Sequence, residues 1–337
     1  MRNYTKKLRG PIAILGAGGF IGINLLNKIL QYRKDVVGFS SNPNNNWRIK
    51  QNNIPAKNIA KCDLLKKEDI ASLIKKYKPK TIFNLAGYGG YSKQKDVERI
   101  YQTNFQSTVN LIEELKKNKF SSYIYAGSQS EYGLNSAAPS EDSKLLPNSH
   151  YAVSKTAVSY LLNYYGKIEK LPVVHLRLYS IYGPWEEPDR LMPVLIDNVK
   201  IGKLPHFVDP SISRDFIYVD DVVEAMLVVA ERLCHSGKRM KRAHPESDSG
   251  VASFPRMTLY GEAFNVASGK KTTIKELAYL VKKIFKIKQT PVFGSMKNRI
   301  WDLKDWYGNP SKMNRFIGWK AKISLKEGLE KFYQYEK

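Results

Sequence analysis

The stretch from Ile12 to Gly22 reads IAILGAGGFIG, and it decides the class of fold. Four apolar residues, Ile12–Leu15, predict a buried strand, and the spacing of apolar residues in Phe20–Tyr32 predicts a helix directly after it. Glycines between a strand and a helix allow a tight turn that brings backbone N–H groups close to phosphate oxygens. The spacing is G-x-x-G-x-x-G with an extra glycine, rather than a strict G-x-G-x-x-G. It predicts a site for a dinucleotide pyrophosphate, formed by Gly16, Gly19, Phe20, Ile21 and Gly22.

Strand-like and helix-like segments alternate through the first half of the chain. Further strands are expected at Val36–Phe39, Thr81–Leu85, Ser122–Tyr125 and Pro172–Leu178. Further helices are expected at Asp69–Tyr77, Val97–Lys117 and Tyr151–Tyr165. Strands joined through helices by short links form parallel sheets that helices cover on both faces. The sequence therefore predicts an α/β fold: a Rossmann-type doubly wound parallel sheet with a smaller C-terminal substrate-binding lobe.

The second half of the chain indicates how two lobes divide the sequence. We expect the dinucleotide-binding domain to comprise residues 1–183, 214–234 and 261–269. The helix-like and strand-like segments that return to it are Val219–Leu233 and Glu262–Val266. The nucleotide-sugar-binding lobe is expected to comprise 184–213 and 270–337. Residues 235–256 are polar, basic and rich in Ser, Gly and Pro, which predicts a basic surface insertion.

Lysine and arginine exceed aspartate and glutamate by 55 − 31 = 24 in this chain of 337 residues. The basic residues are scattered along helix-like stretches, which favours solvated helix faces, while net charge alone keeps nucleic-acid binding open as an alternative. No apolar run reaches the ~18 residues of a membrane span. The two cysteines, Cys62 and Cys234, match no zinc or redox spacing. We therefore expect a cytoplasmic protein that binds no nucleic acid, membrane or metal.

The end of the second predicted strand bears on the choice of dinucleotide. An acidic residue that binds the ribose hydroxyls of NAD would stand there, but this chain has Ser40, Ser41 and Asn42. Asp35 lies at the other end of the strand, and Arg48 is near enough in sequence to reach a 2′-phosphate. The pattern therefore favours NADP(H) over NAD(H). Asp63, followed by Leu64, is placed either to accept from the adenine amino group or to cap a helix, and both interpretations stay open.

Tyr151 and Lys155 are four residues apart, so they share one face of a predicted helix. A free tyrosine has a pKa of about 10, and a nearby ammonium favours its phenolate, so the pair suits acid–base chemistry. Ser128 ends a predicted strand earlier in the chain, at the sheet edge where α/β folds bind ligands. Its hydroxyl would share the proton path with Tyr151.

Five blocks of sequence carry a resemblance to a known family: Gly16–Gly22, Asn84–Gly87, Ser128–Gly133, Tyr151–Lys155 and Arg214–Val222. Over nearly its whole length the chain resembles an extended short-chain dehydrogenase/reductase of the NAD-dependent epimerase/dehydratase family, whose members act mostly on nucleotide-activated sugars. The resemblance implies a catalytic triad of Ser128, Tyr151 and Lys155. It implies further cofactor contacts by Leu85, Ala86, Gly87 and Asn104.

The resemblance also bears on the substrate and on assembly. Arg214, and Arg299 as a second arginine, would bind the diphosphate of a nucleotide-diphosphate sugar, since a guanidinium binds phosphate oxygens in pairs. A surface ion pair with a neighbouring aspartate is the alternative for Arg214. Members of the family commonly form homodimers, here through the helices expected at Val97–Lys117 and Tyr151–Tyr165.

Departures from the family pattern limit the reaction. Ser180 stands where the family's R-x-x-N-x-Y-G-P motif has asparagine. Gln129 and Ser130 stand where many 4,6-dehydratases carry an Asp–Glu pair, and Glu131 would point to the other side of an extended chain. Dehydration is therefore disfavoured.

Hydride transfer at a sugar carbon, expected at C4, remains as the reaction, with Tyr151 as acid and base. It fits an epimerase or a 4-ketosugar reductase, and a non-catalytic dinucleotide sensor is the alternative of another class. Substrate contacts are expected from the two departures and from a glycine-rich turn: Gln129, Ser130, Ser180, Tyr88, Tyr91 and Ser92.

Overall fold

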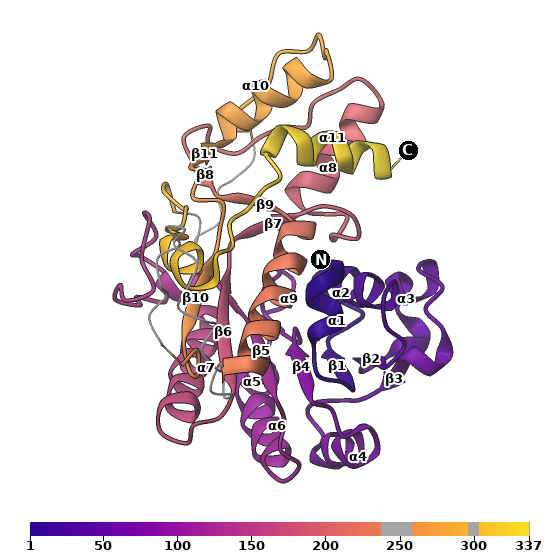
Figure 1. Cartoon of the computed structure of the whole chain (residues 1–337). Coiled ribbons are helices and arrows are strands. Elements are labelled where there is room, and N and C mark those ends of the chain that lie inside the picture. The colour runs from indigo at the N-terminus through magenta and orange to yellow at the C-terminus, as the bar shows by residue number, and fades with distance from the viewer. Residues whose placement is uncertain (237–257, 296–302, 337) are drawn as a thin grey trace, which may run out of the picture.

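The computed structural model describes residues 1–236, 258–295 and 303–336. Its centre is a seven-stranded parallel sheet with the strand order β10-β6-β5-β4-β1-β2-β3 (Figure 1). The order reverses between β1 and β4, and α/β sheets bind ligands at such a reversal, beyond the carboxyl ends of the strands. The predicted doubly wound Rossmann-type sheet is thus confirmed. Its strands are β1 (Ile12–Leu15), β2 (Val36–Ser40), β3 (Ile59–Lys61), β4 (Thr81–Asn84), β5 (Ser122–Ser128), β6 (Val173–Leu178) and β10 (Ala263–Val266).

Successive residues of the strands feed two cores, one on each face of the sheet, because side chains alternate along a strand. On one face, Ile12 and Ile14 pack with α2 (Phe20–Leu30) and α9 (Val219–Ser236). On the other face, Ala13 and Leu15 belong to a core with residues of α4, α6 and α7. These helices are α4 (Lys67–Tyr77), α6 (Ser107–Lys116) and α7 (His150–Lys167).

The helix predicted over 97–117 is interrupted. Helix α5 (Val97–Tyr101) passes into a π-helical segment, Gln102–Gln106, before α6 begins. A π-helical segment of a single turn is too short to show a period of its own in the sequence, so the apolar spacing predicts one continuous helix. The short elements α1 (Arg2–Lys7), α3 (Trp47–Gln51) and β3 were not predicted either, because they carry too few apolar residues to show a period.

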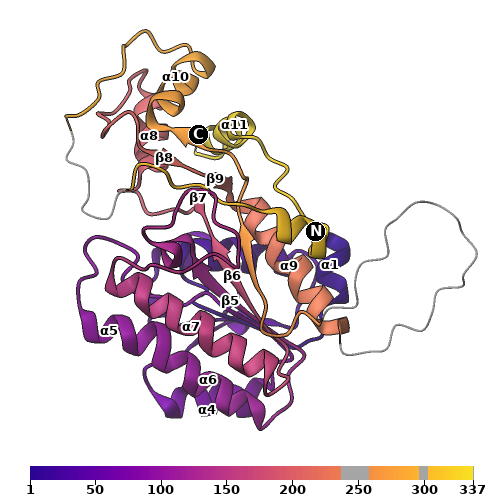
Figure 2. The same ribbon diagram turned by 90° about the vertical axis from the view of Figure 1, so that its left-hand side faces the viewer.

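A third core belongs to helices that lie beyond the carboxyl ends of β5 and β6, as Figure 2 shows. It is formed by α8 (Leu191–Lys200), α10 (Ile274–Ile284) and α11 (Leu325–Tyr335), with buried Leu195, Leu277 and Phe332 among its residues. Two small sheets connect it to the rest: β7 (Ser180–Tyr182) with β9 (Phe216–Tyr218), and β8 (Ser213–Arg214) with β11 (Thr272–Thr273). As expected, α9 and β10 return to the large sheet, where β10 pairs with β6.

Most of the expected basic insertion, residues 237–256, lies outside the described residues. In the part of the chain that the structure describes, no helix is long and apolar enough to cross a membrane.

Candidate active site

The glycine turn joins β1 to α2 at the strand-order reversal. Gly16 has a φ of +75°, and a Cβ there would lie 2.8 Å from the backbone of Leu85 and Ala86 at the end of β4. A Cβ on Gly22 would collide with the carbonyl oxygen of Gly16. Gly19 caps α2, so the N–H groups of Phe20, Ile21 and Gly22 form its first turn and have no partner within the helix. Such free N–H groups at a helix N-terminus fit a pyrophosphate.

Two side chains that follow β2 hold this turn from outside. Asn46 Nδ2 donates to the Gly18 carbonyl at 3.0 Å. Arg48 is buried; its Nε donates to the Trp185 carbonyl at 2.7 Å, and its guanidinium pairs with Glu187 at 3.1 Å. The sequence predicted that Arg48 could reach a 2′-phosphate. In the structure its guanidinium instead contacts the segment that follows β7.

The adenosine side lies at the ends of β2 and β3. Ser41 and Asn42 are exposed just past β2, and the Asn42 N–H donates to Ser40 Oγ at 3.4 Å. Asp63 Oδ1 accepts from the Leu65 N–H at 3.1 Å, while Leu64 is buried. Asp63 therefore bonds within the turn before α4 and does not cap that helix, whose N-cap residue is Lys66, while its contact with the adenine amino group stays a prediction.

The end of β4 meets helix α7 next to the glycine turn. A Cβ on Gly87 would lie 3.4 Å from Lys155 Nζ, so glycine keeps this side of the lysine clear. Asn104, wholly buried in the π-helical segment, accepts from the Tyr88 N–H and donates to the Tyr88 carbonyl, both at 2.9 Å. Its amide also donates to Ser154 Oγ at 2.8 Å. Asn104 thus ties the turn after β4 to α7.

The three residues of the expected triad lie together. Lys155 Nζ is 5.8 Å from the centre of the Tyr151 ring, and Tyr151 shares a hydrogen bond with Ser128. Lys155 Nζ donates to Tyr125 Oη at 3.0 Å and to the Ala126 carbonyl at 2.9 Å. Burial raises the pKa of Tyr151 to about 12, although the bond with Ser128 opposes the shift. Burial lowers the pKa of Lys155 to about 8.

Several expected substrate residues surround Tyr151. Gln129 Nε2 donates to Ser180 Oγ at 3.4 Å, which joins the two departures from the family pattern. A Cβ on Gly90 would lie 3.7 Å from the Tyr151 ring, so the glycine-rich turn passes directly over it. The ring of Tyr91 lies 5.6 Å below the guanidinium of Arg190, a residue that sequence reasoning missed.

Other expected substrate residues lie farther out. The Tyr88 ring stacks against Arg99 at 4.8 Å, and Ser92 is exposed. Arg214 donates to the Ser213 carbonyl at 2.8 Å and lies 5.1 Å from the ring of Trp306. Its expected companion, Arg299, lies outside the described residues.

The chain can now be compared with known proteins. Residues 12–240 match the model of the NAD dependent epimerase/dehydratase family. The chain belongs to this family. A UDP-glucose 4-epimerase of Mycolicibacterium smegmatis is 26% identical over 96% of this chain and 97% of its own length. A probable UDP-glucuronate 4-epimerase of Rhizobium meliloti is 24% identical over 96% and 95%.

Among solved structures, a UDP-glucuronic acid 4-epimerase of Bacillus cereus, in complex with UDP-glucuronic acid and NAD, is 25% identical with a TM-score of 0.77. The match covers 96% of this chain and 98% of that one. A UDP-glucose 4-epimerase of Thermotoga maritima, with UDP-glucose, has a TM-score of 0.78 at 23% identity, covering 96% and 98%. The fold of this family member is therefore similar to that of these two epimerases over 96% of the chain.

Proposed function

We propose that this family member is a nucleotide-sugar 4-epimerase that acts on a UDP-sugar and keeps NAD bound through each turnover. The observation that carries the proposal is the meeting of Ser128, Tyr151 and Lys155 at the carboxyl edge of the sheet, beside a glycine turn that fits a pyrophosphate. Relatives that match the chain along almost all of its length are 4-epimerases.

The residues of the triad divide the work at the sugar. Bound NAD would accept a hydride from C4 and return it. Tyr151 takes the proton of the C4 hydroxyl and later gives it back to the ketone oxygen, with Ser128 sharing that hydrogen bond. The Lys155 ammonium favours the tyrosine phenolate, which matters because burial, although opposed by the bond with Ser128, raises the pKa of Tyr151 to about 12.

The cofactor proposed is NAD, although the end of β2 favours NADP(H). Arg48, the first cation that follows that strand end in the sequence, is buried and paired with Glu187, so it is not poised for a 2′-phosphate. The Bacillus cereus enzyme carries NAD. The fit of a dinucleotide rests on the glycine turn and on the cleared space at Gly87.

We also propose the two-lobe division expected from the sequence and a homodimer through α5 and α7. The outer side of α7 exposes Val153, Tyr160 and Tyr164, and Val97 of α5 is exposed as well. Exposed apolar side chains gathered on two helices suit a partner surface. Light scattering would give twice the chain mass, and Tyr160→Lys would convert dimer into monomer.

The function is tested by two measurements on freshly purified protein. Denaturation followed by mass spectrometry should release NAD close to one per chain, because an epimerase regenerates its cofactor in every turnover. UDP-glucose and UDP-glucuronic acid are then offered without added cofactor, and the product is identified by chromatography against the C4 epimers. An empty site that fills with NADPH, together with turnover only when NADPH is supplied, would replace the epimerase by a ketosugar reductase.

A further inference from the structure

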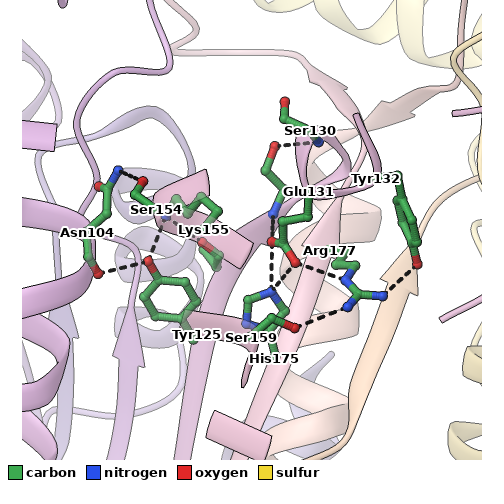
Figure 3. A network of polar contacts seen from close by, with 12 residues as sticks. Asn104, Tyr125, Ser130, Glu131, Tyr132, Ser154, Lys155, Ser159, His175 and Arg177 are labelled. Atoms are coloured by element: carbon green, nitrogen blue, oxygen red, sulfur yellow. Dashed lines mark hydrogen bonds and ion pairs between the residues drawn. The ribbon is translucent and has the colours of Figure 1, made fainter. Parts of the chain in front are cut away.

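A buried carboxylate lies directly behind Ser128. Glu131 has no exposed surface, and its Oε1 accepts the backbone N–H of Ser128 at 2.8 Å. His175 Nε2 lies 2.8 and 2.9 Å from the two carboxylate oxygens, and Arg177 Nε donates to Oε2 at 2.9 Å (Figure 3). Both partners are side chains of β6. The glutamate therefore fixes the peptide of Ser128 to the neighbouring strand.

The same cluster reaches Lys155 by a second route. The His175 ring stacks on the Tyr125 ring with centres 5.4 Å apart and an interplanar angle of 25°. Tyr125 Oη in turn accepts from Lys155 Nζ at 3.0 Å. Gly127 lies against His175 and Glu131, and a Cβ on this glycine would overlap both His175 Nε2 and the Glu131 carboxylate. An unbroken set of contacts thus runs from Glu131 to Lys155 on one side and to Ser128 on the other.

The charge state of the cluster follows from its partners. Burial would raise the pKa of Glu131, but His175 and then Arg177 together hold it below its usual value. Burial lowers the pKa of His175, and its Nδ1 has no partner among the residues that the structure describes, so the neutral ring donates through Nε2. Arg177 also donates to Tyr132 Oη at 2.8 Å and to Ser159 Oγ at 3.1 Å. Glu131 is therefore a fully bonded anion.

An ion pair is a costly way to fill a core, because apolar residues of similar volume often stabilise as well or better. A functional role for the negative charge of Glu131 in the active site would explain why an ion pair is buried here. We propose that Glu131 is a positioning residue for the proposed epimerisation, on which this inference rests: its carboxylate, braced by His175 and Arg177, holds the Ser128 peptide and sets the electrostatic field at Tyr151 and Lys155.

The sign of this field follows from the charges around the two groups. The anion opposes phenolate formation at Tyr151 and favours the ammonium of Lys155. From other elements, Tyr91 also opposes the phenolate, whereas Arg190 favours it. Removing the negative charge of Glu131 should therefore lower the pKa of Tyr151 and of Lys155 together, and the whole pH profile should move towards acid.

Three variants separate charge from geometry. Glu131→Gln keeps the shape and removes the charge, and we expect the profile of kcat/KM to shift acidwards by about one pH unit. Glu131→Asp keeps the charge but moves the carboxylate away from the Ser128 N–H, because aspartate is one methylene shorter. We expect kcat to fall about tenfold, while the pH dependence of kcat/KM stays where it is. Glu141→Gln is the matched control: this half-buried carboxylate accepts from the Asn265 N–H at 2.7 Å and touches neither Ser128 nor His175. Glu141 meets the cluster through its main-chain carbonyl, which accepts from Arg177 at 3.0 Å and which the substitution leaves in place, so neither quantity should change.

A readout without substrate separates this inference from the proposed function. Tyrosine labelled with ¹³C at Cζ is titrated by NMR in the NAD-loaded protein, with the Tyr151 signal assigned by Tyr151→Phe. A lower midpoint in Glu131→Gln supports the inference even if no UDP-sugar turns over, which would sink the epimerase alone. The inference would be overturned if folded Glu131→Gln and the wild-type protein had the same Tyr151 midpoint, or if Glu141→Gln shifted that midpoint equally. If Glu131→Gln does not fold, Glu131→Asp decides: an unchanged kcat would overturn the role in positioning.

Discussion

The dinucleotide side of the site comes from one continuous turn, Gly16–Gly22, whereas the sugar side joins Tyr91, Gln129 and Ser180 from three separate parts of the chain. On the first side backbone N–H groups are proposed to bind the pyrophosphate, and glycine is required at positions 16 and 22 because a Cβ there would press on neighbouring backbone. On the second side hydroxyl, amide and ring groups meet around Tyr151. Substitutions on the two sides should therefore have different effects. Those in the glycine turn should lower the NAD content and the stability of the protein, and those on the sugar side should alter turnover.

The largest effect is expected on the sugar side. Tyr151→Phe removes the group that carries the proton, so kcat should fall by about 10³-fold or more. Released NAD should stay close to one per chain, because the glycine turn is unchanged. Tyr279→Phe, at an exposed tyrosine of α10, serves as the control and should keep wild-type turnover. Wild-type turnover by Tyr151→Phe would remove Tyr151 from the mechanism.

The next effect belongs to the dinucleotide side. In Gly22→Ala the new methyl group would press on the Gly16 carbonyl, and overpacking of this kind costs about 1–3 kcal/mol. Thermal unfolding should occur at a lower temperature, and NAD should be lost on purification. Gly202→Ala is the matched control, since its Cβ would meet nothing within 4 Å and its φ of +71° carries only local strain. Retention of full NAD content by Gly22→Ala would show that this close approach is not needed.

A pH effect distinguishes the two sides without mutation. Burial lowers the pKa of Lys155 to about 8, and the working form is the ammonium. The ammonium is lost as the pH rises through about 8, while the Tyr151 phenolate, whose pKa lies at about 12, still increases over the same range. Turnover should therefore rise about tenfold per pH unit below pH 8 and level off above it. Bound NAD should not change over the same range, because the glycine turn does not titrate. A rate that keeps rising about tenfold per pH unit from pH 8 to 10 would mean that Lys155 stays charged or is not required.

The smallest effect is expected at the contact between the two departures from the family pattern. Ser180→Ala removes the acceptor of the Gln129 amide, whose Oε1 already lacks a partner within the described chain. A single neutral hydrogen bond is worth about 1 kcal/mol, so KM for the UDP-sugar should rise about fivefold. Initial rates over a range of UDP-sugar concentrations measure this change. No change in KM, with an altered NAD content instead, would place Ser180 on the dinucleotide side.

Local patterns predicted most of the sheet. Four consecutive apolar residues, Ile12–Leu15, followed by glycines, predicted β1 and the turn after it, and all four are buried. An apolar run and the conformational freedom of glycine can both be recognised within a few neighbouring residues. The i, i+4 spacing of Tyr151 and Lys155 placed them on one face of α7, where the structure has them. Short elements such as β3 escaped, because three residues are too few to show a period.

Long-range contacts escaped as well, for a different reason. Arg48 looked available for a phosphate in the sequence, and its partner Glu187 lies far along the chain. The residues around Glu131 in the sequence do not predict its contact with His175, because that contact depends on the register between β5 and β6. A polar residue in a sequence carries no mark of whether it will be buried with a partner or left in water.

The doubly wound sheet, the glycine turn and the functional groups of Ser128, Tyr151 and Lys155 could be predicted from the amino-acid sequence, because they depend on residues that are close together in the chain. The folded structure was needed to show that Arg48 pairs with Glu187, that Asn104 joins the turn after β4 to α7, and that an ionised Glu131 lies buried behind Ser128. These features depend on which segments pack together. Packing also sets the local dielectric and hence the pKa values of Tyr151 and Lys155.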